Sequence, residues 1–289
     1  MMKIVGVMLA RNEDWIIGLS LRAALLWCDE VVVLDHGSTD GTPGIVAEVQ
    51  REHEGRITLM RWPFDGAWLE ADARQATLDA ARRRGATHVA IVDADEALTG
   101  NWLGSIRDLF DDLMPGEVIA LPMVSPWRSM REHRVDKCVW TQSMLTLGFC
   151  DDANVAYMTH DGYHHHCRAP HGHRRVVHPL GEGSPKYGGA MHLQWVDWKR
   201  VQAKHAWYKM METVRYPGRK TPEELNAMYG QALDERGLKT ESLPADWLAP
   251  YVGFPAPRSI ESWHVAECQR LLREYGADAF KGLDLFGVV

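Results

Sequence analysis

Two aspartates one residue apart follow a short apolar stretch, and their spacing could hold a metal ion. The stretch Ala90-Ile91-Val92 leads directly into Asp93-Ala94-Asp95. Such an apolar run predicts a buried strand, and side chains at i and i+2 of a strand point the same way. We therefore expect Asp93 and Asp95 to converge where the strand leaves its sheet. Two carboxylates there suit Mg²⁺ or Mn²⁺ held jointly with a diphosphate, although a polar loop that begins a helix has the same composition.

The surrounding sequence predicts strands that alternate with helices. We expect strands over 3–10, 30–34, 57–62 and 89–92, and helices over 15–27, 43–53 and 69–84. This alternation favours a mostly parallel sheet, whose ligands bind at the carboxyl ends of the strands. Beyond it, the pattern predicts a strand over 118–123, an irregular stretch over 125–189, and helices over 102–113, 195–216, 223–236 and 259–275.

The overall composition is that of a globular protein. The 289 residues are 46% hydrophobic and 25% charged, with a formal net charge of −7, which argues against a protein coated in nucleic acid. No apolar stretch approaches the roughly 20 residues that span a bilayer. The five cysteines are scattered and odd in number, so we expect no disulfide framework and a reducing, cytoplasmic location.

Four polar segments lie at or near the ends of the predicted strands in a defined order. They are Ala10-Arg11-Asn12-Glu13, the loop from Asp35 to Thr42, Ala73-Arg74-Gln75 and Asp93-Ala94-Asp95. In this order the chain resembles the family 2 glycosyltransferases, whose pattern is an aspartate, then Gly-Ser-x-Asp-Gly-Thr, then Asp-x-Asp. The resemblance covers residues 3–98 well and continues more loosely over 189–208. It implies the GT-A fold, an α/β fold with a mostly parallel central sheet, followed by a helical C-terminal extension.

The same resemblance implies a domain organisation and an activity. Residues 1–216 would form the GT-A domain, with a nucleotide-binding half over 1–98 and an acceptor-binding, metal-closing half over 99–216. Residues 217–289 would form the helical extension. The enzyme would transfer a sugar with inversion from a nucleotide-sugar donor, with UDP as the favoured nucleotide, to a hydroxyl acceptor. Mn²⁺ or Mg²⁺ would neutralise the leaving diphosphate.

The resemblance also implies roles for single residues. Ala10, Arg11, Asn12 and Glu13 would lie near the nucleoside, Asp35 would accept the uracil N–H, and Arg74 would contact the nucleotide from its helix. Asp93 would lie nearer the ribose, beside Ala94, and share the metal with Asp95, the main ligand. His192, which follows Gly188-Gly189, would complete the metal shell from the far side.

Each of these residues has a structural alternative. Residues 38–42 are typical of turns and helix caps, and we expect them to be mostly structural. Arg74 could be a solvated helix residue, and His192 a structural histidine beside an apolar segment. Arg200 and Lys204 are four apart and share a helix face, which would either meet the diphosphate or form a solvated basic surface.

A segment over 160–178 holds half of the histidines of the chain, together with Cys167 and Arg168. Three interpretations remain open: a zinc site, a loop that binds the acceptor, and a solvated loop. Inverting transfer needs a general base for the acceptor hydroxyl. The acidic pair that relatives use is not recognisable here, so Asp161 and Glu182 are the candidates, and a histidine of the segment is chemically possible.

The acceptor and three rival functions also remain open. The acceptor could be a polar glycan, or a hydroxymethylated pyrimidine base in DNA, as in phage-type modifying glycosyltransferases, and the basic segment over 164–175 motivates the latter. A nucleotidyltransferase would use the same metal chemistry. A nucleotide-sugar-binding module without a base would bind the donor and transfer nothing.

Overall fold

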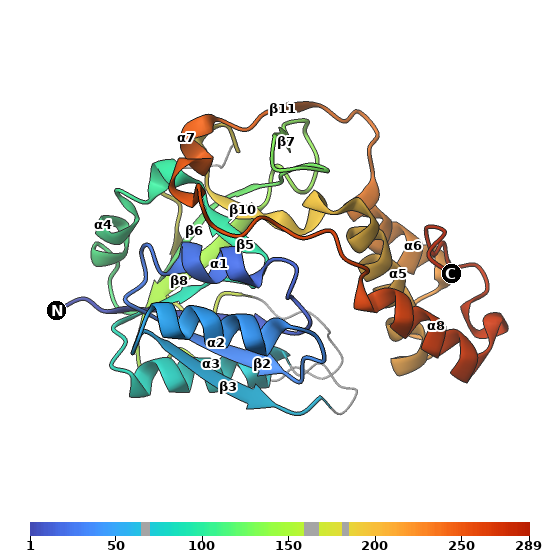
Figure 1. The fold of residues 1–289 in the computed structure, drawn as a ribbon, viewed down its shortest axis with the longest axis horizontal. Helices are drawn as coiled ribbons and strands as arrows, with labels where there is room; N and C mark the ends of the chain where they lie inside the picture. The colour runs from blue at the N-terminus through green and yellow to red at the C-terminus, as the bar shows by residue number, and fades with distance from the viewer. Residues whose placement is uncertain (65–69, 159–167, 181–184) are drawn as a thin grey trace.

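The computed structural model describes residues 1–64, 70–158, 168–180 and 185–289, and Figure 1 shows a twisted central sheet with helices on both faces. The first strands of the sheet are β1 (Ile4–Ala10), β2 (Glu30–His36), β3 (Ile57–Trp62) and β4 (His88–Ile91). They are connected by α1 (Ile17–Ala24), α2 (Thr42–Glu52) and α3 (Glu70–Arg83). β1 pairs in parallel with β2 and β4, and β2 pairs in parallel with β3. The predicted alternation of strands and helices and the mostly parallel sheet are confirmed.

Alternating side chains along the strands divide the core between the two faces of the sheet. Ile4 and Met8 face α1, α2 and α4 (Ile106–Asp111), whereas Val5 and Val7 face Leu78 and its neighbours in α3. The end of each helix follows from local chemistry. Pro43 occupies the first turn of α2, where a missing N–H costs nothing, and Gly85, with φ of 78°, follows the end of α3.

The second half of the sheet corrects the prediction of an irregular stretch over 125–189. β8 (Met144–Cys150) lies within it and inserts antiparallel between β4 and β6 (Glu117–Val124). The strand order is β3-β2-β1-β4-β8-β6-β10-β5, with the short β9 (Arg175–Val177) beside β6. The helix expected over 102–113 is also shorter, because a 3₁₀ turn, η1 (Gly100–Trp102), precedes α4.

Two short strands carry residues of the predicted site into this sheet. β5 (Glu96–Leu98) directly follows the Asp93-Ala94-Asp95 turn and pairs antiparallel with β10 (Ala190–His192), so that His192 lies opposite Glu96. Gly189 precedes β10 and exchanges hydrogen bonds with Thr99. Its backbone packs so closely on β6 that an added Cβ would lie 2.0 Å from the carbonyl oxygen of Pro122.

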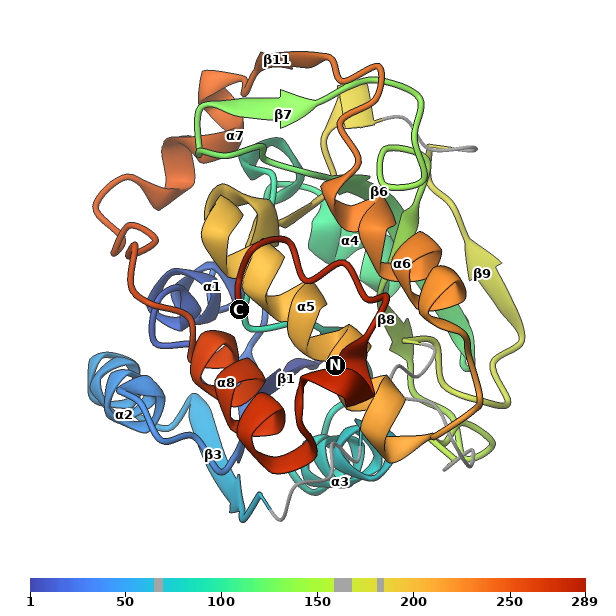
Figure 2. The same ribbon diagram turned by 90° about the vertical axis from the view of Figure 1, so that its right-hand side faces the viewer.

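The C-terminal part of the chain is mostly helical and packs beside the edge of the sheet. Figure 2 shows α5 (Trp198–Arg215) between α6 (Pro222–Gly230) and α8 (Trp263–Tyr275). In the intervening chain, β11 (Thr240–Ser242) pairs with β7 (Glu132–Arg134) in a separate two-stranded sheet. The remaining short elements are α7 (Ala245–Leu248) and the 3₁₀ turns η2 (Pro185–Tyr187), η3 (Leu193–Val196), η4 (Gln231–Leu233), η5 (Ala249–Tyr251) and η6 (Ala277–Phe280). Of the helices in the described residues, none combines the length and the apolar character that crossing a bilayer requires.

Candidate active site

A cavity of about 430 Å³ lies between the carboxyl ends of β1 and β4 and the helices α5, α6 and α8. Its sheet side includes Arg11, Glu13, Asp93 and Asp95, and its helical side includes side chains of all three helices. This is the edge of the sheet where an open α/β fold binds its ligands. Several of the predicted site residues, Arg11, Glu13, Arg74, Asp93, Ala94, Asp95 and His192, therefore line one cavity.

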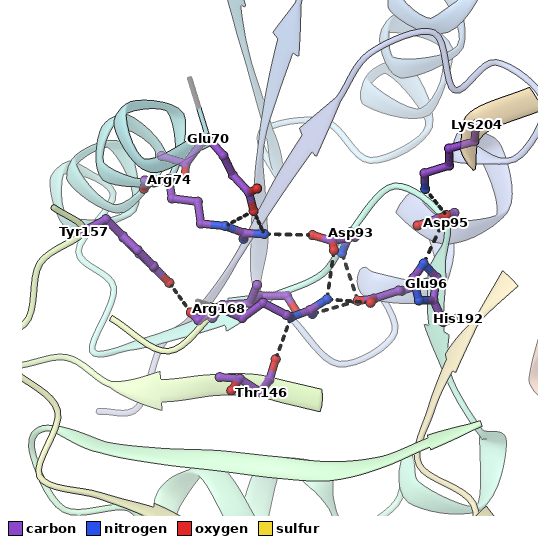
Figure 3. Close-up of polar contacts among 12 residues, drawn as sticks. Glu70, Arg74, Asp93, Asp95, Glu96, Thr146, Tyr157, Arg168, His192 and Lys204 are labelled. Atoms are coloured by element: carbon purple, nitrogen blue, oxygen red, sulfur yellow. Dashed lines mark hydrogen bonds and ion pairs between the residues drawn. The ribbon is translucent and has the colours of Figure 1, made fainter. Parts of the chain in front are cut away.

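The two aspartates reach the cavity from a turn and not from a strand. β4 ends at Ile91, and Asp93 and Asp95 lie between it and β5. The expectation that strand alternation aims both side chains at one point is therefore wrong in its geometry. Figure 3 shows that Asp93 and Asp95 meet different partners, although both line the same cavity.

Asp95 faces an imidazole and an ammonium group. Its Oδ2 lies 3.3 Å from Nε2 of His192 and 3.9 Å from Nζ of Lys204. Burial alone would raise the pKa of Asp95, but the attraction of His192 and Lys204 outweighs it and holds that pKa well below its usual range. Burial lowers the pKa of His192 and the Asp95 carboxylate raises it, with a net increase. The pair brings one carboxylate and one imidazole to the same point.

Asp93 lies instead between two arginines. Nη1 of Arg168 donates to Oδ2 of Asp93 at 2.8 Å, and Nη2 of Arg74 lies 3.6 Å from Oδ1. Burial would raise the pKa of Asp93, but Arg168 and Arg74 outweigh this effect and lower it. Arg74 also pairs with Glu70 at 2.7 Å and is 5% exposed. The alternative of a solvated Arg74 is therefore wrong.

Arg168 holds the turn by more than its bond to Asp93. Its two terminal nitrogens contact both carboxylate oxygens of Glu96 at 2.5 and 2.8 Å, and Nη2 also donates to the carbonyl oxygen of Ile91. Its Nε donates to the carbonyl oxygen of Thr146 on β8. Sequence reasoning considered Arg168 only as part of the basic, histidine-rich segment that could bind the acceptor, and it gave Glu96 no role. The one available signal was an acidic residue directly after the Asp-x-Asp motif.

The loop after β2 is structural, as predicted, and it fixes the end of β1. Asn12, with φ of 54°, accepts a hydrogen bond from the backbone N–H of Thr39 through Oδ1, and its own N–H donates to Oγ of Ser38. Thr42 Oγ1 accepts from the N–H of Glu13, and Asp35 Oδ1 accepts from the N–H of Ser38. These bonds satisfy the backbone of a sharp corner.

Arg11 and Glu13 project from this corner into the cavity. Nη1 of Arg11 donates to the carbonyl oxygens of His36 and Gly37, and its guanidinium lies 3.5 Å from the centroid of the Phe64 ring. Glu13 accepts hydrogen bonds from Nε1 of Trp15 and from Nη2 of Arg200.

Arg200 and Lys204 do not form a solvated basic surface. Arg200 is 5% exposed and also donates to the carbonyl oxygen of Asn12. Lys204 lines the cavity, and its Nζ lies 3.4 Å from Oε1 of Gln194. Lys204 therefore belongs to the cavity wall, whereas Arg200 does not line the cavity and holds Glu13 from behind.

Several predicted residues lie elsewhere. Ala10, Asn12 and Asp35 are buried behind the cavity wall and do not line it, whereas Ala94 does. Asp161 and Glu182 fall outside the described residues, as do the histidines at 160 and 164–166. In the part of the chain that is described, no group of three or more His, Cys, Asp and Glu side chains could hold a metal ion. A zinc site among the described histidines therefore has no support, and an ion at Asp95 and His192 would need ligands other than the side chains of the described residues.

Comparison with known proteins gives one family and many similar solved structures, two of which are described here. The profile of the family described as "Glycosyl transferase family 2" matches residues 7–168, more than half of the chain. No curated protein matches the sequence. One similar structure, described as that of "a Mycobacterial Protein", is 21% identical with a TM-score of 0.32, and the match covers 43% of this chain and 42% of that one.

The second structure is glucosyl-3-phosphoglycerate synthase from Mycobacterium tuberculosis in complex with Mn²⁺, UDP and glucosyl-3-phosphoglycerate. It is 18% identical with a TM-score of 0.30, and the match covers 43% of this chain and 44% of that one. The part of this chain that matches thus spans less than half the length of each of these two structures.

Proposed function

The chain belongs to glycosyl transferase family 2, and on that premise we propose that it transfers a sugar from a nucleotide-sugar donor to a hydroxyl acceptor with the help of a divalent metal ion. The nucleotide would be UDP, and the transfer would invert the configuration. The ion would be Mn²⁺ or Mg²⁺. The cavity between the sheet edge and α5, α6 and α8 would hold the donor.

The observation that carries this proposal is the pair Asp95–His192 on the cavity wall. A carboxylate oxygen and an imidazole nitrogen 3.3 Å apart are two converging ligands, and the mixed set fits Mn²⁺ better than the oxygen-preferring Mg²⁺. A diphosphate would supply further oxygens. When bound, the ion would act as a Lewis acid that offsets the charge of the departing nucleotide.

Cationic side chains next to this pair support the binding of a diphosphate. Lys204 is a compact charge 3.9 Å from Asp95, which suits phosphate oxygens. The guanidinium of Arg11 is held against Phe64 and the loop after β2, where it would meet the nucleoside together with Glu13. Arg74 and Arg168 fix Asp93 on the wall, so that its carboxylate is oriented before the ribose arrives.

Two assignments rest on the family resemblance alone. Uridine is proposed because of Asp35, which lies at the carboxyl end of β2 behind Arg11. The general base is proposed to be Asp161 or Glu182. Substitution of Asp35 should therefore abolish sugar transfer and weaken donor binding. Substitution of the general base should abolish sugar transfer and leave donor binding intact.

Thermal unfolding with and without ligands tests the proposal. A ligand that binds only the folded state raises the midpoint by mass action, so UDP with Mn²⁺ should stabilise the wild type more than UDP alone. Asp95→Ala and His192→Ala should remove the metal-dependent part of this shift. Asp79→Ala on the exposed face of α3 is the control. Equal stabilisation of wild type and both site variants, whether or not metal is present, would refute the metal assignment.

A further inference from the structure

The helical side of the cavity is formed by aromatic rings that lie outside the part of the chain matched by the family. We call Trp207, Tyr208, Tyr229, Trp263 and His264 the ring wall; all five line the cavity, and all follow residue 168. We propose that the ring wall is the acceptor subsite and that it takes an uncharged, hydroxyl-bearing ring stacked against the aromatic side chains. This inference rests on the proposed function, because it assigns the sheet side of the same cavity to the donor.

The rings of the wall form one continuous surface. Tyr229 stacks on Tyr208 with centroids 5.4 Å apart, and Tyr208 contacts Trp207 at 5.3 Å. Trp207 meets the edge of Trp263 at 5.1 Å, and Trp263 stacks on His264 at 4.0 Å. Each contact joins residues on α5, α6 or α8, so that packing of the three helices holds the rings in place. Such a surface offers apolar area at little cost in side-chain entropy.

The ring wall carries no charge at neutral pH. Burial, with help from Arg200 and Lys204, lowers the pKa of His264 well below its usual value, so its imidazole is neutral. Nδ1 of that ring lies 2.7 Å from Oγ of Ser262. The hydroxyl of Tyr229 donates to Oε1 of Glu212, which does not line the cavity. The rings themselves therefore offer a phosphorylated or carboxylated acceptor no counter-charge, and the cations at the two ends of the wall, Lys204 and Arg11, are assigned to the donor.

The wall also leads to the reacting end of the donor. The ammonium group of Lys204 lies next to Asp95. The attraction of Tyr208 contributes to the raised pKa of Lys204, so the side chains of Lys204 and Tyr208 are close to each other. At the other end, the guanidinium of Arg11 lies 5.4 Å from the centroid of the Trp263 ring. A ring stacked on the wall would thus have one edge toward Asp95 and His192, where the sugar is transferred.

The size of the cavity limits the acceptor to a compact group. A volume of about 430 Å³ is at the lower end of the range for pockets that hold one small ligand. The donor would occupy most of this volume, so the part of the acceptor that lies within the cavity should be small. Sugar rings and nucleobases both present a flat apolar face, and both are sources of the same chemistry.

Saturation-transfer NMR on the full chain with saturating UDP and Mg²⁺ tests the proposal. The probes are methyl β-D-glucopyranoside, 5-hydroxymethyl-2′-deoxyuridine and 3-phosphoglycerate. We expect one of the two neutral probes to bind most tightly and its ring protons to show the strongest saturation-transfer signal. Binding of the glucoside would identify a sugar ring as the source, and binding of the nucleoside would identify a base.

Two variants and one control connect the binding to the ring wall. Trp263→Ala removes the ring that contacts both Trp207 and His264. It should raise the dissociation constant of the preferred probe about fivefold to tenfold. Met228→Trp adds bulk at a cavity-lining position of α6 that is 43% exposed, which leaves the core intact. Met228→Trp should also weaken binding of the preferred probe. Trp198→Ala, a tryptophan that does not line the cavity, should leave binding unchanged.

Failure of this inference can be told apart from failure of the proposed function. The thermal shift with UDP and metal reports on the donor side, and both wall variants should retain it. If the wild type shows that shift but 3-phosphoglycerate binds most tightly, the acceptor class is wrong. The acceptor subsite is also refuted if neither neutral probe binds, or if both wall variants bind the preferred probe like the wild type. Absence of the UDP shift in the wild type would refute the proposed function itself.

Discussion

The sheet side of the cavity presents charged groups, whereas the helical side presents aromatic rings. On the sheet side, Asp95 is buried and the side chain of Asp93 is 30% exposed; Arg168 neutralises Asp93, and His192 neutralises Asp95 together with Lys204, which reaches it from α5. On the helical side, Trp207, Tyr208 and Trp263 are held by contacts with one another. The first arrangement suits the handling of a charged leaving group, and the second suits the recognition of a neutral partner.

The difference also predicts how each side responds to substitution. Removing one member of a buried ion pair leaves its partner charged and unpaired, which costs several kcal/mol. Removing one ring leaves the others in contact and loses mainly buried area. Changes on the sheet side should therefore have larger effects than changes in the C-terminal helices, and the four predictions below are ordered accordingly.

The largest effect is expected for Asp95→Asn on transfer. Loss of a charged ligand should reduce kcat/KM by about a thousandfold, since a metal ion contributes several kcal/mol to transition-state stabilisation. The rate is measured as release of nucleoside diphosphate from the sugar nucleotide that gives the largest thermal shift. Asp93→Asn is the variant for comparison. It should lower kcat/KM less than Asp95→Asn does, because Asp93 is paired with Arg168 and Arg74. Equal losses would mean that the two carboxylates do not differ in role.

Arg168→Met tests the cost of unpairing charge on the sheet side. Asp93 and Glu96 would both lose their arginine, and the free energy of unfolding should fall by about 3–5 kcal/mol. Urea denaturation measures it. Arg175→Met is the matched control: Arg175 also pairs with a glutamate, Glu117, but its side chain is 70% exposed, so the loss should stay below about 1 kcal/mol. Similar losses in both variants would show that burial of the Arg168 network is unimportant.

Lys209 tests the helical side through pH. Its Nζ donates to the carbonyl oxygen of Asp284 at 2.6 Å and lies 3.8 Å from the centroid of the Phe286 ring, and burial lowers its pKa to about 8. Above about pH 8, Lys209 loses its proton in the folded protein but keeps it in the unfolded chain, until the pH reaches the higher pKa of the unfolded state. In this window the unfolded chain binds more protons at this residue than the folded protein does. The free energy of unfolding should therefore rise with pH in this window, by on the order of 2 kcal/mol.

The control for this pH dependence is Lys209→Met, measured by urea denaturation between pH 7.5 and about 10. The variant lacks the titrating group, so its stability should rise less over the same window. If the two proteins show the same slope, the ammonium group of Lys209 is not the origin of the pH dependence.

The smallest effect is expected at the start of α6. Oγ1 of Thr221 accepts from the N–H of Glu224, whose carboxylate accepts from the N–H of Thr221. Loss of this capping box in Thr221→Ala should cost about 1 kcal/mol in the free energy of unfolding. Thr221→Ser keeps the hydroxyl and should retain most of the wild-type stability. A serine variant as unstable as the alanine variant would point to packing of the methyl group instead.

Much of the sheet side could be predicted because its signals are local. β1 to β4 follow from apolar runs that alternate with helical periodicity, and Asp95, Arg74 and Glu13 stand in short motifs next to strand ends. β8 could not be predicted, because its position depends on the free edges of β4 and β6 and because Gly148 weakens its strand pattern. Gly148 is required there, since an added Cβ would lie 2.3 Å from the carbonyl oxygen of Val89.

The long-range contacts escaped prediction for a related reason. Arg168 meets Asp93 only because β8 brings its part of the chain to the end of β4, and no spacing in the sequence encodes that approach. The high tryptophan content indicates that some of these rings line a ligand surface, but aromatic residues at helical intervals are typical of a core, so Trp207, Tyr229 and Trp263 could not be told apart from core residues. Both features depend on topology that periodicity does not determine.

The contact between Gly189 and Pro122 has a consequence for mutational tolerance. Any side chain at 189 would collide with the backbone of β6 and push β10 away, and His192 would move with it. A saturation library should thus show position 189 to be as intolerant as His192 itself, although Gly189 does not line the cavity. A map of inactive variants would mark this glycine together with His192, the proposed metal ligand, and the reason at Gly189 would be steric.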